Sequence, residues 1–519
     1  MDMIEQLASR NQLLNGLLNA QAYNHEVDAI QVIETHISWV LLTGRYAYKI
    51  KKPVYFGFLD FSSLEKRRLC CQEELRLNQR LAKTIYLSVV PITGNSTCPK
   101  IGGTDHIIEY AVKMRQFPSG QLLSEIAALG QLGQNEIDQL ADIVADFHQN
   151  IPKANDASPY GHAEAIKHWF DENFTHIFPY IKDERIQQQL HAVSDWSQQE
   201  WLKRADYIAL RKQQGFVREC HGDLHLSNIT LLNGQPCPFD CIEFNPMLRW
   251  IDVISEVAFL WMDLCHLDYT KLAFRFLNRY LQQTGDYQGL ALLPYYVVYR
   301  ALVRAKVAVL RMQQYQSETY TTEFNHFTQF ICLAEQSIAV KHPMILLTHG
   351  FSGSGKSYFS SQLAEIMGAI HLRSDVERKR LFGYSKQANT HSSLHNGIYS
   401  EAAHLKTYHH LAELVASIVT AGFSVIVDAT FLKCWQRDLF KQLAAQYQIK
   451  YFILDFSVAT NILQQRILQR QHDASEATLE VLEHQQSSAE ALTAQEQNVT
   501  VSIHTDQNII SVYNALLKQ

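Results

Sequence analysis

Residues 350–357 limit the possible folds of this chain more than any other stretch. They read Gly-Phe-Ser-Gly-Ser-Gly-Lys-Ser and fit the pattern G-x-x-x-x-G-K-[ST]. An apolar run at 344–348 precedes them and a helical pattern follows, so they predict a loop between a buried strand and a helix. Glycines in such a loop let backbone N–H groups surround phosphate oxygens, and the helix start adds its positive end. The predicted ATP-binding residues of this loop are Gly350, Phe351, Ser352, Gly353, Ser354, Gly355, Lys356 and Ser357.

The residues around this loop predict the rest of a nucleotide site. Lys356 is expected to reach the outer phosphates and Ser357 to bind Mg²⁺. Apolar strands at 344–348, 424–428 and 451–456 alternate with helices, which is typical of a parallel α/β sheet.

Two aspartates follow strands of this predicted sheet, at the edge where an open α/β sheet builds its site. Asp375 comes after the run 370–372, and Asp428 ends the run 425–427. Each is a candidate metal or water ligand, or a base, and the alternative for each is the N-cap of a helix. Further on, Arg466 and Arg470 lie four residues apart on a helical pattern, so they could close over the phosphates or form a solvated helix face.

A second constellation stands in the first half. Asp223 and Asn228, in His-Gly-Asp-Leu-His-Leu-Ser-Asn, have the spacing of H-R-D-x-x-x-x-N in protein kinases, with Gly in place of Arg. Asp240 follows twelve residues after Asn228, beyond an Asn-Gly turn signal between predicted strands at 229–232 and 237–240. Asp223 could accept the proton of an attacking hydroxyl, while Asn228 and Asp240 could hold Mg²⁺ against the nucleotide phosphates.

Such a site also needs a lysine on a strand and a glutamate on a helix. Lys49, in the β-rich run 46–50, is the candidate for the phosphates, and Glu74, in the helical pattern 63–81, is its candidate partner. Lys51, Lys52 and Glu73 compete for these roles, because a shift of one residue in a strand reverses the face that is presented. A solvated basic strand end is the remaining alternative.

Length and composition restrict the number of domains, the kinds of partner and the cellular compartment that can be expected. The 519 residues exceed what one core can serve, and Lys341-His342-Pro343 breaks a helical pattern before the strand at 344, so we place the main boundary between residues 340 and 341. Lys and Arg number 46 against 52 Asp and Glu, which disfavours a broad nucleic-acid or membrane surface. The nine cysteines form no CxxC pair, and no signal peptide or membrane span is recognisable, so we expect a reduced, cytoplasmic protein.

The second half resembles a known group of P-loop kinases. The stretches 350–357, 372–378 and 427–431 are similar to those of zeta toxins, chloramphenicol phosphotransferase, gluconate kinase and the polynucleotide kinase domain. The resemblance implies that Asp375 is the base that activates a substrate hydroxyl and that Arg378 contacts substrate or phosphate. It also implies that Arg466 and Arg470 are lid arginines.

The first half, from about residue 30 to 339, resembles the aminoglycoside phosphotransferase and choline kinase superfamily, whose fold is that of protein kinases. The longer string 221–252 is similar to two-domain bacterial proteins that join such a half to a P-loop ATPase half. No G-x-G-x-x-G is present, and Cys-Ile-Glu follows Asp240 in place of Phe-Gly, which favours a small-molecule kinase over a protein kinase. The implied fold class is an α+β, protein-kinase-like bilobal domain at 1–340, followed by an α/β P-loop NTPase domain with a parallel sheet at 341–519.

These readings predict a bifunctional ATP-dependent phosphotransferase. ATP and Mg²⁺ are the expected cofactors, and a small-molecule hydroxyl is the expected acceptor in each half. One alternative is a nucleotide-binding regulatory protein in which the first half controls a toxin-like P-loop kinase. Another is a nucleic-acid end kinase, which the equal numbers of basic and acidic residues from Lys341 onward disfavour.

Overall fold

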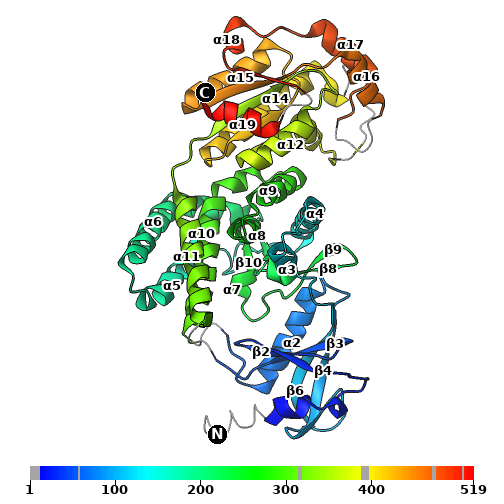
Figure 1. Cartoon of the computed structure of the whole chain (residues 1–519), viewed down its shortest axis with the longest axis vertical. Helices are drawn as coiled ribbons and strands as arrows, with labels where there is room; N and C mark the ends of the chain where they lie inside the picture. The colour runs from blue at the N-terminus through cyan, green and yellow to red at the C-terminus, as the bar shows by residue number, and fades with distance from the viewer. Residues whose placement is uncertain are drawn as a thin grey trace. The chain divides into compact units, whose positions relative to one another are not determined.

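The computed structural model of the chain describes residues 12–55, 59–313, 318–386, 388, 397–469, 475–504 and 508–518. Contacts divide the chain into two compact units. Unit 1 comprises Met1–Glu136, Asn150–Ile166 and Ala205–Glu256, and unit 2 comprises Ile137–Gln149, Lys167–Arg204 and Val257–Gln519. Figure 1 follows the elements along the chain. Within the described residues, no helix combines the length and the apolar composition that a membrane crossing requires.

Unit 1 begins with an antiparallel sheet of six strands in the order β1-β2-β3-β6-β4-β5. Its strands are β1 (Gln31–Glu34), β2 (Ser38–Leu42), β3 (Tyr46–Lys51), β4 (Tyr86–Asn95), β5 (Cys98–Ile101) and β6 (Ile107–Arg115). Helix α2 (Leu64–Asn78) packs on β4 and β6. Ser63 caps it by accepting a hydrogen bond from the Lys66 N–H, and its buried residues recur every three or four positions, as an amphipathic helix requires.

The rest of unit 1 holds short elements that carry the predicted first site. They are α3 (Leu123–Ala128), the strand pair β7 (Val217–Glu219) and β10 (Trp250–Asp252), the hairpin β8 (Ile229–Leu232) and β9 (Gln235–Pro238), and α7 (Pro246–Arg249). Asn233 and Gly234 both have positive φ, at 52° and 77°, which is the geometry of a two-residue hairpin turn. The predicted second strand at 237–240 is therefore wrong by two residues: β9 starts directly after the turn, and Asp240, with φ at 66°, leaves the extended conformation.

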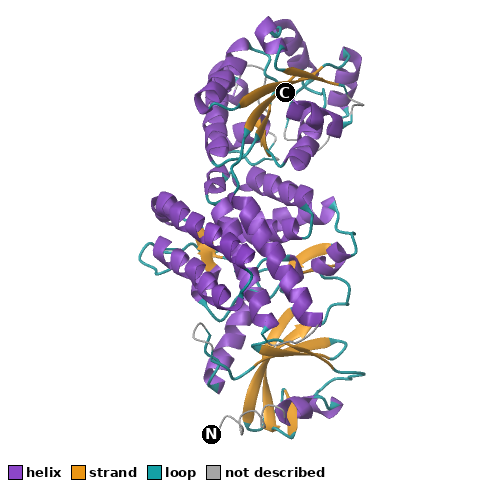
Figure 2. Ribbon diagram, turned by 60° about the vertical axis from the view of Figure 1, so that its left-hand side comes forward, coloured by secondary structure: helices purple, strands orange, loops and turns teal. Residues whose placement is uncertain are grey.

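Helices make up most of the middle of the chain, as Figure 2 shows. They are α4 (Gln134–Asn150), α5 (Ala163–Ile177), α6 (Glu184–Gln213), α8 (Val253–His266), α9 (Thr270–Thr284), α10 (Leu293–Met312) and α11 (Glu318–Ile338). Helix α10 packs along α11, which ends shortly before the predicted boundary between residues 340 and 341. Unit 2 runs through this boundary, and the division at 340/341 stays a prediction.

The second half contains a parallel sheet of five strands in the order β12-β13-β11-β14-β15, which confirms the predicted fold class. The strands are β11 (Met344–His349), β12 (Ile370–Arg373), β13 (Val425–Asp428), β14 (Lys450–Phe456) and β15 (Thr500–Ile503). The helices are α12 (Lys356–Met367), α13 (Ser374–Leu381), α14 (Glu401–Thr420), α15 (Cys434–Tyr447), α16 (Thr460–Leu468), α17 (Leu479–Ser488), α18 (Ala494–Gln497) and α19 (Ile509–Lys518). One buried cluster joins α12 and α19 to the sheet, and the right-handed crossovers place α14 and α15 on the opposite face.

Helix α9 covers the outer edge of this sheet at β12. The Asn278 side chain donates to the Ala369 carbonyl (3.0 Å) and accepts from the His371 N–H (2.8 Å). The Gln282 side chain donates to the His371 carbonyl (3.3 Å). Two amide side chains thus provide hydrogen bonds that a neighbouring strand would otherwise supply.

Candidate active sites

One connection of unit 1, between β7 and β8, brings Asp223 and Asn228 together. Asp223 lies in the loop after β7, and Asn228 ends a single helical turn, Leu226–Asn228, directly before β8. The Asn228 amide group donates to the Asp223 carbonyl (3.0 Å) and to its carboxylate (2.9 Å). This pair of hydrogen bonds sets the orientation of the carboxylate and turns the amide oxygen of Asn228 away from it.

Hydrogen bonds on either side of Asp240 hold its backbone in the left-handed region. The preceding carbonyl, of Phe239, accepts from His221 Nε2 (2.8 Å), and the Asp240 N–H donates to the Tyr86 hydroxyl (3.2 Å). The next N–H, of Cys241, donates to the Asn78 side chain (2.9 Å). Because a residue other than glycine pays an energetic cost at positive φ, such fixed geometry is typical of functional positions.

Lys49 links this aspartate to α2. Its ammonium lies 2.9 Å from Glu74 Oε1 and also contacts the Asp240 carboxylate. Burial disfavours the charged lysine, but the carboxylates of Asp240 and Glu74 outweigh it and raise the Lys49 pKa. Of the competing residues, Lys52 pairs with Glu34 on the surface, and Glu73 pairs with Arg76 and Arg249.

Lys51, which also competes for this role in the sequence, shares Glu74 with Lys49. It is fully buried, lies 2.5 Å from the other Glu74 oxygen and contacts Glu243. Burial raises the pKa of Glu74, but the two lysines outweigh it and bring the value to about 2. The sequence indicates this shared contact, because residues 49 and 51 are two apart on a strand and their side chains therefore point to the same face.

The loop 350–357 forms between β11 and α12 as predicted. Gly350, Gly353 and Gly355 all have positive φ, at 137°, 85° and 90°. A Cβ atom at Gly350 would lie 2.6 Å from the Phe456 carbonyl, so no other residue fits there without a shift. Lys356 curls back over this loop and donates to the carbonyls of Gly350 (2.9 Å) and Phe351 (2.6 Å).

Ser357 and Asp428 meet below this loop. The Ser357 hydroxyl hydrogen-bonds to Asp428, and His371 Nε2 (3.2 Å) and Arg373 Nε (3.7 Å) also approach this carboxylate. Burial raises the Asp428 pKa, but these neighbours outweigh burial and bring it to about 2. A hydroxyl and an ionised carboxylate are oxygen ligands of the kind that Mg²⁺ prefers, so the donor set fits the predicted metal.

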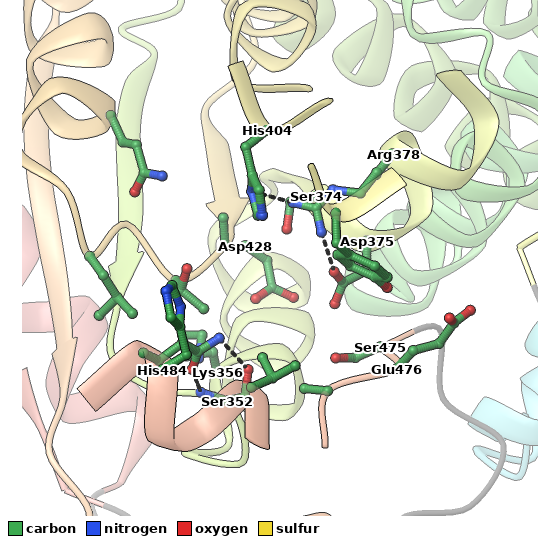
Figure 3. Close-up of a pocket in the computed structure, with 18 of the residues that line it drawn as sticks. Ser352, Lys356, Ser374, Asp375, Arg378, His404, Asp428, Ser475, Glu476 and His484 are labelled. Atoms are coloured by element: carbon green, nitrogen blue, oxygen red, sulfur yellow. Dashed lines mark hydrogen bonds and ion pairs between the residues drawn. The ribbon is translucent and has the colours of Figure 1, made fainter. Parts of the chain in front are cut away.

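A cavity of about 1390 Å³ extends from the phosphate loop toward α13 and α14. Figure 3 shows Lys356 and Asp428 on one side of it and Asp375, Arg378 and His404 on another. Asp375 Oδ1 lies 3.7 Å from the nearest guanidinium nitrogen of Arg378. The predicted lid arginine Arg466 donates to the Gly353 carbonyl (3.3 Å), while Arg470 lies outside the described residues.

Gln485 of α17 also reaches the phosphate loop. Its amide oxygen accepts from the Ser352 N–H (3.0 Å), and its amide nitrogen donates to the Ser352 hydroxyl (3.0 Å). No sequence signal indicated this contact, because the two residues are separated by 133 positions and glutamines are common on helix surfaces.

Proteins of related sequence identify the family of this chain. It is 31% identical over 456 residues to the uncharacterized protein Rv2004c of Mycobacterium tuberculosis, an alignment that covers 87% of this chain and 88% of the relative. The uncharacterized protein Mb2027c of Mycobacterium bovis matches with the same values. The chain belongs to this family. Within it, residues 345–492 match the model of the AAA domain, which confirms the nucleotide-binding domain predicted for the second half and implies ATP binding there.

Solved structures resemble the two halves separately. Choline kinase from Cryptosporidium parvum is 12% identical with a TM-score of 0.39, covering 64% of this chain and 96% of that protein. A gluconokinase from Sinorhizobium meliloti is 20% identical with a TM-score of 0.25, covering 34% of this chain and 91% of that protein.

The two sites share a chemical plan, although they use different folds. Each holds a lysine that can neutralise phosphate charge, namely Lys49 or Lys356, and oxygen groups that suit Mg²⁺. Each also holds a further carboxylate, Asp223 or Asp375, that could orient or deprotonate a hydroxyl. Bound at these oxygens, Mg²⁺ would supply positive charge against the nucleotide phosphates.

Proposed function

We propose that the chain is a bifunctional ATP-dependent phosphotransferase, in which each half transfers the γ-phosphate of ATP to a hydroxyl of a small molecule. The observation that carries this proposal is the arrangement in unit 1, where Asn228 orients Asp223, and Lys49 contacts both Glu74 and Asp240. A buried lysine held between two carboxylates is already in the charged form that a phosphate requires.

In each half the proposed reaction is a direct displacement. The acceptor oxygen forms a bond to the γ-phosphorus, while the bond from that phosphorus to the bridging oxygen breaks and its electron pair leaves with ADP. The hydroxyl proton passes to Asp223 in the first half and to Asp375 in the second. Lys49 and Lys356 stay bound to the phosphates and offset their charge.

Binding of the metal is proposed on the same grounds. Asn228 and Asp240 would hold Mg²⁺ in the first half, and Ser357 and Asp428 in the second, since each pair offers oxygen ligands. The lid role of Arg466 is supported by its contact with the Gly353 carbonyl, which places the side chain at the phosphate loop. Arg470 belongs to the same proposal from its sequence position alone.

Screening the full chain with labelled ATP and a metabolite extract tests the proposal. New phosphorylated species should appear, and mass detection identifies them. Those made by the first half should disappear in Asp223→Asn and persist in Asp375→Ala, and the reverse should hold for the second half. If neither variant changes any product although both still bind ATP, the phosphotransferase function is refuted. The predicted alternative that Asp375 is an N-cap is wrong, because α13 starts at Ser374 and its N-cap is Arg373. If Asp375→Ala lowers only the thermal midpoint, the second half is a nucleotide-dependent regulator, and Asp375 only stabilises the first turn of α13 through its charge.

A further inference from the structure

Arg249, the last residue of α7, is a buried cation of unit 1 that the proposed reaction does not use. It is 4% exposed, and its guanidinium donates in three directions. One terminal nitrogen binds Glu73 of α2 (2.7 Å), the other binds the Glu243 carbonyl (3.0 Å), and Nε binds Glu219 of β7 (3.3 Å). Because arginine presents its donors in a rigid planar fork, these contacts fix a helix, a loop and a strand relative to one another.

The loop that Arg249 holds begins at the proposed metal ligand Asp240. The Glu243 carbonyl lies three residues after this aspartate, and between them the Ile242 N–H donates to the His221 carbonyl (3.0 Å). Asp240 has a φ of 66°, a conformation that costs free energy and persists only where the surrounding structure holds it. The guanidinium of Arg249 therefore helps to fix the backbone that carries the Asp240 carboxylate.

The backbone of Arg249 contacts the other loop of the site, which carries Asp223. Its carbonyl accepts from the Cys220 N–H (2.8 Å). Gly222, with φ at 89°, stands where H-R-D of protein kinases has an arginine. A Cβ atom at Gly222 would lie 2.9 Å from the Leu248 carbonyl and 3.3 Å from Arg249 Cα, so a larger residue would push α7 away. The arginine next to this loop thus comes from α7 and not from the loop itself.

Resting on the function proposed above for the first half, we propose that Arg249 is a positioning residue that fixes the metal ligand Asp240. It acts through the loop that it holds, and not by contact with metal, nucleotide or acceptor. Glu73 anchors it to α2. The next residue of this helix, Glu74, holds the phosphate-binding lysine Lys49. Two adjacent residues of α2 thus place the two positive charges, lysine and metal, that the nucleotide phosphates require.

The test measures how much Mg²⁺ the first half needs to bind a nucleotide. The full chain carrying Lys356→Ala, in which the first site alone is expected to remain, is titrated by calorimetry with AMP-PNP at a series of Mg²⁺ concentrations. Replacing a residue that holds a metal ligand in place typically lowers metal affinity about 10- to 100-fold. We therefore expect Arg249→Gln to raise the Mg²⁺ concentration at half-saturation by about 10-fold or more.

Arg76→Gln is the matched control. Arg76 binds the same two carboxylates, Glu73 and Glu219, but in the part of the chain that the structure describes it makes no hydrogen bond to residues 240–245. It should leave the Mg²⁺ requirement unchanged, whereas loss of a cation from the ion cluster would affect both variants alike. Arg249→Lys keeps the charge, but a single ammonium cannot replace the planar fork, so this variant should also need more Mg²⁺.

The inference is overturned if Arg249→Gln and Arg76→Gln need the same Mg²⁺ concentration, or if Arg249→Lys needs no more than the parent. Should Arg249→Gln fail to fold, Glu73→Gln decides by the same comparison, because it removes the anchor on α2 and keeps the arginine. If nucleotide binding by the parent does not depend on Mg²⁺, the metal role proposed for Asp240 fails and this inference fails with it. If the parent depends on Mg²⁺ and Arg249→Gln behaves like the parent, this inference alone fails.

Discussion

Replacing Lys51 by methionine should destabilise the first half strongly, although Lys51 is not the lysine proposed to bind phosphate. The change removes an ammonium that is fully buried between Glu74 and Glu243. Removing one partner of a buried ion pair costs about 3–5 kcal/mol, because the other charge stays buried. Glu74 keeps Lys49 as a partner, and so the cost falls mainly on Glu243.

Urea unfolding of the full chain measures this cost. With a slope of roughly 2–3 kcal/mol/M, the midpoint of the transition that reports on the first half should fall by about 1–2.5 M. Lys52→Met is the matched control: Lys52 is the next residue, but its partner Glu34 is 60% exposed, so its loss should cost under about 1 kcal/mol. The double variant Lys51→Met/Glu243→Gln should recover part of the loss, since no unpaired carboxylate remains. Equal midpoints for Lys51→Met and Lys52→Met would refute the reasoning.

Three further outcomes are expected. Calorimetry with AMP-PNP should find two binding sites per chain, and Lys356→Ala should leave one. If the Lys356→Ala variant still has two unchanged sites, the loop 350–357 does not bind the nucleotide. Gln485→Ala should bind the analogue about 2- to 10-fold more tightly, because a net hydrogen bond of about 0.5–1.5 kcal/mol no longer competes for the Ser352 N–H; weaker binding would instead give Gln485 a supporting role. Glu74, whose pKa is lowered from 4.5 to about 2, contributes stability that is present above pH 4.5 and is lost as the pH falls toward 2, so Glu74→Gln should flatten the pH dependence of the unfolding midpoint in that window.

Local signals predicted much of this molecule. The phosphate loop at 350–357 and the Asn-Gly turn follow from residues that are neighbours in sequence, and both form as expected. The joint contacts of Lys49 and Lys51 with Glu74 follow from strand periodicity once the strand is known. Such features depend on backbone geometry that a few adjacent residues dictate.

Contacts between distant segments were not predictable in this way. Gln485 contacts Ser352, which is 133 positions away, and Asn278 contacts Ala369 of the β12 edge, which is 91 positions away. An amide side chain in a sequence does not indicate which residue it will bind. The left-handed backbone of Asp240 has the same origin. It depends on three hydrogen bonds: His221 binds the Phe239 carbonyl, the Asp240 N–H donates to Tyr86, and the Cys241 N–H donates to Asn78. These residues come together only in the folded chain.

The amide side chains of α9 determine what happens when the second half is produced without the first. Cutting the chain between residues 340 and 341 would remove Asn278 and Gln282 and leave the outer edge of β12 with unpaired backbone groups at Ala369 and His371. A bare strand edge recruits other chains, so the excised second half would be prone to self-association. In the intact chain, the side chains of Asn278 and Gln282 thus protect this strand edge from pairing with another chain.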